Sequence, residues 1–287
     1  MKKLALIFLT FIALTSCSNK KVSFFCNNNN DLPLVENDSI SVIDSLKQFY
    51  TPIIDGIWVL TDYINEIEKT KSPIKSRHKL DDIVTMVINA KNQSDSIKIY
   101  ASVNNHEVID FIVYFQMGQK SNSLKTNCYY LSNSYELGYE TINDENYLFL
   151  YCYSKKNELI GKTQFSKVAE YWQNNNETWG LQYIVNKKLL AGNFVLIDNT
   201  KKQIKFDANG SVTGFKDFNT YKITTDFLGD PIFLENDIIH FRNEKHDITE
   251  YAFKINGDTI CLYSVISEEE TGLPFALNEL KYKLVRK

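Results

Sequence analysis

The C-terminal third of the chain is a succession of short segments in which apolar and polar residues alternate, and this pattern constrains the fold most. Alternation with period two is typical of strands that bury one face. About eight such segments follow one another closely, and no long helix is expected between them. We therefore expect antiparallel strands that pair with their sequence neighbours and close as a β-barrel. The expected strands are residues 193–198, 203–207, 211–215, 220–225, 238–242, 250–256, 259–265 and 280–286.

Two Asn-Gly dipeptides support these hairpins. Asn209-Gly210 and Asn256-Gly257 each separate two alternating segments. Asn and Gly tolerate the positive φ that a type I′ turn requires at both central positions. The sequence therefore predicts tight turns centred on these two dipeptides.

The first half of the chain begins with two expected helices. After Asp38-Ser39, which can cap a helix, apolar residues recur with helical spacing up to Tyr50, and Pro52 is expected to end the helix. A shorter helix is expected from Asp62 to Lys69, before Pro73.

Beyond these helices the pattern changes to strands. Residues 97–103 and 109–115 alternate on either side of a turn at Asn104-Asn105, and residues 128–137 and 147–153 are expected to be further strands. The chain is thus expected to be mainly β, with two antiparallel barrels and a short N-terminal helix.

A polar interruption divides the chain. Residues 170–178 are interpreted as the boundary between an N-terminal β domain, residues 39–172, and a C-terminal barrel, residues 173–287. An internal echo supports two related halves: DGIWVLTD, from Asp55, aligns with AGNFVLID, from Ala191. The match is short, so a chance likeness is the alternative.

The N-terminus has the features of an export signal. A basic start is followed by an uncharged stretch from Leu4 to Ser16, which is shorter than the roughly 20 residues that span a bilayer. This combination is typical of a secretory signal peptide. Leu14-Thr15-Ser16-Cys17 resembles a lipobox, so we expect residues 1–16 to be removed between Ser16 and Cys17, and Cys17 to carry diacylglyceride and palmitate. An ordinary signal peptide with a chance cysteine is the alternative.

The segment after Cys17 is expected to be a tether. Residues 17–38 contain four consecutive asparagines and are too polar to fold alone. Ser18, in the second mature position, resembles lipoproteins sent to an outer membrane, whereas Lys20 and Lys21 differ from acidic surface-export tags. We therefore expect a lipid-anchored protein of the cell envelope, on the periplasm-facing side of the outer membrane.

Four further cysteines occur beyond the anchor. Cys128 and Cys152 lie in neighbouring expected strands and can pair in a compartment that permits disulfides. The preferred alternative is that these two and Cys261 pack as small apolar residues, with Cys26 in the tether.

A family resemblance begins at the first expected strand. Gly56-x-Trp58 is similar to the first motif of lipocalins, in which the aromatic ring plugs the closed end of the barrel. Gly192 and Phe194 are the equivalent pair in the second half, and the resemblance implies that Arg286, in the last strand, covers Phe194.

The mature chain also resembles a group of uncharacterised Bacteroidota envelope lipoproteins with lipocalin-like domains. The segments that carry the likeness are GIWVLTDY, NNHE, YELGY, FKINGDTICLY and LKYKLVRK. The resemblance implies two lipocalin-like up-and-down barrels and no particular activity.

The sequence contains no catalytic or metal-binding signature. The four histidines, His78, His106, His240 and His246, lack the spacing of zinc ligands, and phosphate-loop and nucleophile-elbow motifs are missing. A net charge of −3 gives no electrostatic footprint for nucleic acid. We therefore expect no enzyme, no cofactor and no metal.

Three residues remain as candidates for contact or modification. His106, at an expected hairpin tip, is a candidate ligand contact, with a solvated turn histidine as the alternative. Ser39 and Ser45 lie in Asp-Ser-aliphatic tripeptides, which resemble the O-glycosylation sites of Bacteroidota envelope proteins.

Tyrosine is concentrated at the end of the first half, for example at Tyr135, Tyr139 and Tyr151. A barrel rich in Tyr and Phe either holds a small apolar ligand or is filled by those side chains, and filling is preferred. We therefore expect a non-catalytic binding module for a small apolar ligand or an envelope protein. The alternatives are an immunity or inhibitor protein against an envelope-targeted toxin, and a hydrolase in which His106 and Glu107 join a site assembled only by folding.

Overall fold

The computed structural model describes most of the chain beyond the expected tether. The described residues are 25–26, 39–80, 82–91, 94–130, 132–171, 176–197, 199–227, 236–267 and 274–287. The expected signal peptide, Cys17 and most of the tether therefore lie outside the described residues.

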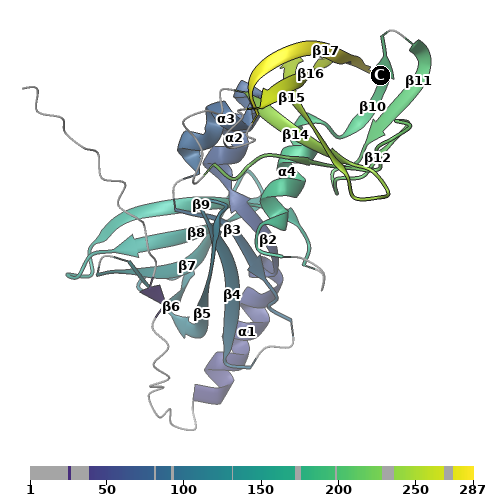
Figure 1. Cartoon of the computed structure of the whole chain (residues 1–287). Coiled ribbons are helices and arrows are strands. Elements are labelled where there is room, and N and C mark those ends of the chain that lie inside the picture. The colour runs from purple at the N-terminus through teal and green to yellow at the C-terminus, as the bar shows by residue number, and fades with distance from the viewer. Residues whose placement is uncertain are drawn as a thin grey trace, which may run out of the picture.

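The first barrel is an antiparallel sheet in which each strand pairs with the next along the chain (Figure 1). Its strands are β2 (Gly56–Leu60), β3 (Ile83–Ile88), β4 (Ser96–Val103), β5 (Glu107–Met117), β6 (Ser123–Tyr130), β7 (Asn133–Ile142), β8 (Glu145–Tyr153) and β9 (Leu159–Ala169). Pairing of β2 with β9 closes the sheet. The two-residue strand β1 (Phe25–Cys26) pairs with β6, which places the backbone of Cys26 opposite Cys128.

The second barrel repeats this order. Its strands are β10 (Gly192–Leu196), β11 (Asn199–Phe206), β12 (Val212–Thr213), β13 (Thr220–Ile223), β14 (Asp237–Arg242), β15 (Ile248–Asn256), β16 (Thr259–Ser267) and β17 (Pro274–Arg286). Pairing of β10 with β17 joins the two ends of the sheet, and a bridge between Ser211 and Thr220 closes the gap beside β12. The expectation of a mainly β chain with two antiparallel up-and-down barrels is confirmed.

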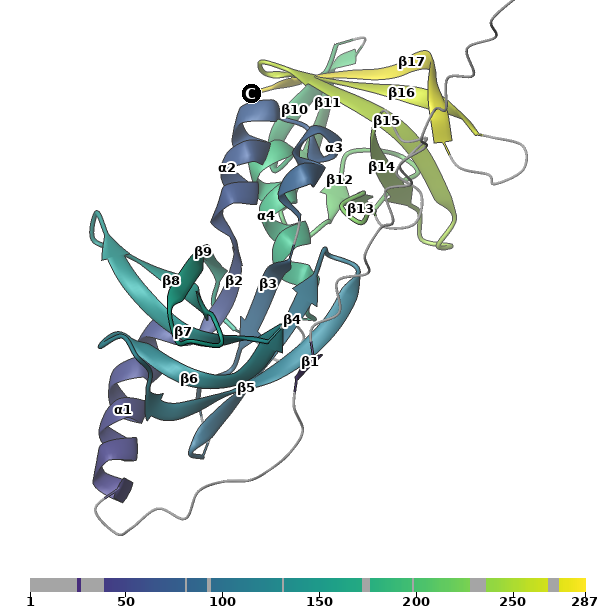
Figure 2. The ribbon, with the colours of Figure 1, turned by 90° about the vertical axis from the view of Figure 1, so that its left-hand side faces the viewer.

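One helix precedes each barrel, and two helices and a 3₁₀ turn follow the first strand of the first barrel. These elements are α1 (Ser39–Ile54), α2 (Thr61–Thr70), α3 (Pro73–Ser76), the 3₁₀ turn η1 (Arg77–Lys79) and α4 (Trp179–Leu189). Figure 2 shows α2, α3 and α4 between the two sheets. Apolar side chains of α2 and α4 join the cores of the two barrels into one continuous buried cluster, and Glu68 of α2 forms an ion pair with Lys188 of α4.

The start of the first strand is built in the same way in both barrels. Gly56 and Gly192 have φ of 131° and 144°, which side chains rarely adopt, and the aromatic residue two positions later is fully buried. In the last strand of each barrel a cation lies over that ring: Lys167 over Trp58 at 6.0 Å, and Arg286 over Phe194 at 4.7 Å. The expected position of Arg286 is thus confirmed, and the likeness of the two halves extends beyond the echo in the sequence.

The first helix extends past the proline that was expected to end it. Pro52 lies inside α1, which continues to Ile54. Proline removes only the hydrogen bond of its own nitrogen and disfavours the helical conformation of the preceding residue. The carbonyl deprived of that bond belongs to Gln48, an exposed residue, so the lost bond lies outside the core. The second expected helix is confirmed as α2.

Strand expectations in the first half were partly wrong. Residues 128–137 are not one strand, because the chain turns between β6 and β7, with φ of 70° at Ser132. The search for alternating apolar and polar residues missed β3, because all of its residues are buried. Helix α4 covers the outer face of β2 and β3, so neither face of β3 is open to water. The search also missed β9, in which Phe165 is the one buried residue.

The Asn-Gly hairpins exist, but their turns differ from the expected type. Asn256 still pairs with Thr259, so the central residues are Gly257 and Asp258. At the other site Phe206 pairs with Val212, which leaves a wider loop that contains Asn209-Gly210. The register of the paired strands depends on which side chains are buried on one face. This register, and not the Asn-Gly dipeptide alone, determines which residues form the turn.

Candidate functional site

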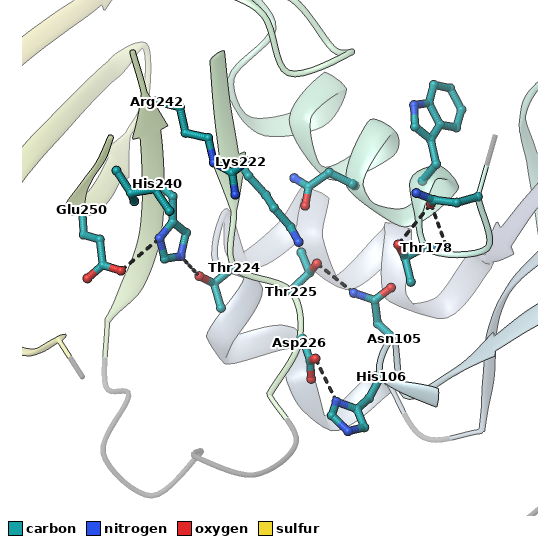
Figure 3. A pocket seen from close by; sticks show the side chains of 14 residues that line it. Asn105, His106, Thr178, Lys222, Thr224, Thr225, Asp226, His240, Arg242 and Glu250 are labelled. Atoms are coloured by element: carbon teal, nitrogen blue, oxygen red, sulfur yellow. Dashed lines mark hydrogen bonds and ion pairs between the residues drawn. The ribbon is translucent and has the colours of Figure 1, made fainter. Parts of the chain in front are cut away.

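A candidate site is a groove between the two barrels, with a volume of about 680 Å³. Three parts of the chain form its walls (Figure 3): the tip of the β4–β5 hairpin, the start of α4, and the outer face of β13, β14 and β15. Most of its lining side chains are polar or charged. We call this cavity the interbarrel groove.

The β4–β5 hairpin tip joins the first barrel to the second. Asn104 and Asn105 have φ of 51° and 55°, as the expected turn requires, and this turn directs the tip towards the second barrel. The Asn105 amide Nδ2 donates a hydrogen bond to Thr225 Oγ1 at 2.9 Å. Asn105 is 7% exposed, and among the described residues its Oδ1 has no hydrogen-bond partner.

His106, the candidate contact residue, is placed at the edge of the groove. Its Nδ1 lies 2.9 Å from Oδ2 of Asp226, which belongs to the second barrel, and both side chains are 47% exposed. The hydrogen bond to Asp226 raises the pKa of His106 above its usual value. Glu107, its partner in the hydrolase alternative, is exposed at the start of β5 and is not among the residues that line the groove.

A row of hydrogen bonds crosses the second barrel's outer face. Nδ1 of His240 lies 3.1 Å from Glu250 Oε1, and its Nε2 lies 2.9 Å from Thr224 Oγ1 (Figure 3). A carboxylate only accepts hydrogen bonds, so Nδ1 carries the proton of the neutral ring and Nε2 accepts from Thr224. Burial lowers the pKa of His240, and the charges of Lys222 and Arg242 lower it further, whereas Glu250 raises it.

Two cations stand beside this row. Lys222 is the strand partner of His240, and Arg242 lies two residues further along β14. Both side chains are exposed and line the groove, and within the described part of the chain neither has an acidic partner within 4.0 Å. Asp226 and Glu250 are instead each bonded to a histidine.

The third wall consists of the first turn of α4 and the residues just before it. Asn176, Thr178, Trp179 and Gln182 line the groove from this side. Asn176 Oδ1 accepts hydrogen bonds from the backbone and hydroxyl of Thr178, both at 3.2 Å, and the Trp179 ring stacks on Tyr183 at 4.6 Å. These bonds hold the start of the helix in place at the groove.

The interior of the second barrel is occupied by aromatic rings. Neighbouring ring centroids lie 4.9 to 6.2 Å apart, which is contact distance for edge-to-face and stacked rings. The rings belong to Phe206, Phe215, Phe218, Phe241, Tyr251 and Tyr282. In the first barrel Tyr135 and Tyr139 pack on the main core, whereas Phe149, Tyr151 and Tyr153 form a separate cluster.

The other residues singled out in the sequence are dispersed. His78 and His246 are exposed and do not line the groove, and the described residues hold no group of three His, Cys, Asp or Glu that could bind a metal. Ser45 is exposed on α1, and the side chain of Ser39 lies outside the described part. Cys128 is buried, and no disulfide joins it to Cys152.

Most residues of the groove were missed in the sequence. Asn105 and Thr225 are 120 positions apart, and no local motif marks either of them. One signal was present: Lys222, His240 and Glu250 occupy outward positions of three consecutive expected strands, so correct pairing would have aligned them.

No family model matches the chain, and no curated protein is significantly similar to it. Among the described residues, no helix combines the length and the apolar character needed to cross a membrane.

Proposed function

We propose that this chain is a non-catalytic binding module of the cell envelope that holds a polar ligand in the interbarrel groove. The proposal places the protein at the outer membrane, anchored through lipid on Cys17, as its N-terminal sequence indicates. The observation that carries the binding site is the groove itself, where hydrogen-bonding side chains from both barrels and from α4 converge on about 680 Å³.

The groove is favoured over the barrel interior for a physical reason. Aromatic rings in mutual contact occupy the core of the second barrel, and a ligand there would have to displace them. The groove needs no such displacement. Its lining favours a polar ligand over the apolar one expected for a barrel interior, because most of its side chains are polar or charged. Among the described residues, Lys222 and Arg242 have no acid within 4.0 Å, and an apolar ligand would cover these charges without pairing them.

The test is native mass spectrometry of the protein purified gently from its own envelope. A bound ligand appears as extra mass that is lost on denaturation. Ile248→Trp adds bulk at the rim of the groove, where Ile248 is 52% exposed, and is expected to abolish the extra mass. Ile266→Trp is the matched control, since Ile266 is 46% exposed on β16, outside the residues that line the groove. Retention of the extra mass in Ile248→Trp would contradict the proposal.

A hydrolase is the second candidate, supported by the order Thr224–His240–Glu250. A hydroxyl bonded to a neutral imidazole whose other nitrogen faces a carboxylate is the arrangement of nucleophile, base and orienting acid in acyl-transfer enzymes. In that role Thr224 Oγ would attack an ester carbonyl and pass its proton to His240 Nε2, which would return it to the departing alcohol. Water would then release the acid from Thr224.

Hydrolysis of p-nitrophenyl acetate tests this second candidate. Thr224→Ala and His240→Gln should each reduce the rate to the buffer level, whereas Thr224→Ser should retain it. Thr249→Ala, an exposed change on the neighbouring strand β15, is the control. A rate that is the same in the wild type and Thr224→Ala would exclude this candidate.

A further inference from the structure

We infer that the ligand of the interbarrel groove carries an oxyanion, a carboxylate or a phosphate, which Lys222 and Arg242 bind. This inference deepens the proposed function and rests on it. It is argued from the charges of the groove, the strand register and the first turn of α4.

The acids of the groove have charged or polar partners within the protein, whereas its permanent cations have no acidic partner among the described residues. The groove's two acids, Asp226 and Glu250, are each bonded to a histidine at 2.9 and 3.1 Å. Within the described residues its two permanent cations, Lys222 and Arg242, have no acid within 4.0 Å. An anion that enters the groove therefore meets cations whose charge is not already used.

Strand register brings these cations together. Lys222 pairs with His240, and Arg242 is the next outward residue on the same strand, so Lys222 and Arg242 are diagonal neighbours. Diagonal neighbours in an antiparallel sheet lie roughly 7–8 Å apart, within reach of two long side chains that converge on one ligand group. In Figure 3 the Lys222 side chain extends into the space between the His240 row and the Asn105–Thr225 contact, and the Arg242 side chain lies above His240. Guanidinium forms paired hydrogen bonds with carboxylate and phosphate oxygens, and ammonium adds a compact charge.

The opposite wall favours the same charge. The first turn of α4 lines the groove, and the N-terminal end of a helix presents backbone N–H groups with a partial positive charge. We therefore assign the class as a small anionic molecule that bears a carboxylate or a phosphate.

Calorimetric titration of the full chain tests the inference with three probes: inorganic phosphate, galacturonate and neutral galactose. We expect an anionic probe to bind and galactose to bind at least about tenfold more weakly. Binding of phosphate but not galacturonate would show that the site recognises a phosphate group. Binding of galacturonate but not phosphate would show that it recognises a carboxylate. Added salt should weaken the binding, because the interaction is between exposed charges.

Variants locate the binding. Lys222→Gln and Arg242→Gln should each weaken anion binding by about tenfold. Lys283→Gln is the matched control, since Lys283 is an exposed cation on β17 of the same barrel and does not line the groove. Binding that is undiminished in the two groove variants, or that falls equally in Lys283→Gln, would overturn the inference.

The two proposals fail in different ways. If galactose binds as well as galacturonate and Ile248→Trp abolishes both, the groove stands and the anionic class is wrong. If no probe binds, the anionic class is also wrong. Native mass spectrometry of the wild type and of Ile248→Trp then tests separately whether the groove binds a ligand.

Discussion

The guanidinium of Arg286 lies 4.7 Å from the centre of the Phe194 ring, which it covers from the last strand of the second barrel. Its Nη1 donates a hydrogen bond to the carbonyl of Ala191 at 2.6 Å, and its Nη2 donates to Leu189 at 3.2 Å. One side chain thus ties the end of the chain to the end of α4. In the first barrel Lys167 occupies the equivalent place over Trp58.

Arg286→Gln should lower the free energy of unfolding by about 2 kcal/mol, because it removes the ring contact and leaves two carbonyls without their charged donor. Urea unfolding followed by circular dichroism measures the change. Lys283→Gln, an exposed substitution on the same strand, should change it by less than about 0.5 kcal/mol. Equal effects of the two variants would show that the guanidinium contributes nothing specific.

Asp237 should make stability depend on acid pH. Its Oδ1 accepts a hydrogen bond from the Ile74 backbone at 2.8 Å, and burial raises its pKa from 3.8 to about 6. The folded state then binds a proton that the unfolded state releases between pH 4 and 6, so this residue's contribution falls as pH rises through that window. Asp237→Asn keeps the acceptor and removes the titration. Urea unfolding at pH 4 and pH 7 measures the free energy of unfolding at each pH. From pH 4 to pH 7 this free energy should decrease less in the variant than in the wild type, and equal decreases would contradict the expectation.

The two contacts between the β4–β5 hairpin and the second barrel should differ in strength. Asn105 and Thr225 are 7% and 2% exposed, whereas His106 and Asp226 are each 47% exposed. A double-mutant cycle with Asn105→Ala and Thr225→Val should give a coupling free energy of about 1 kcal/mol. A cycle with His106→Ala and Asp226→Ala should give less than about 0.5 kcal/mol, because water and salt screen exposed pairs. The reverse order would mean that the histidine contact holds the barrels together.

Cys17→Ser should abolish lipidation. The thiol is the group expected to receive the lipid, and a serine hydroxyl does not replace it. Cells supplied with a clickable palmitate analogue should label the wild type but not the variant, and the variant should leave the membrane fraction. Cys26→Ser is the control. Label that persists in Cys17→Ser would place the lipid elsewhere.

The outcome of the sequence predictions follows from where each strand is buried. In the second barrel inner residues such as Phe206, Tyr221 and Ile223 alternate with exposed residues such as Lys205 and Lys222, so the period-two pattern located these strands. That logic failed at β3, where Ile83 to Ile88 are buried on both faces because α4, distant in the sequence, packs on the outer side.

The groove was hidden for a related reason. His106 was recognised at its hairpin tip, but Asp226 is 120 positions away and no motif links the two. Thr224, His240 and Glu250 lie on or beside successive strands, and only the register brings them within hydrogen-bond distance.

By itself the sequence determined the β class, the up-and-down order of the second barrel, the α2 helix and the Gly-x-aromatic start of each barrel. These features depend on neighbours a few residues apart, whose spacing the chain itself sets. Only the tertiary structure decided how α2 and α4 join the two barrels and which side chains meet in the groove. Those contacts depend on how two closed sheets pack against shared helices, and that packing depends on residues far apart in the sequence.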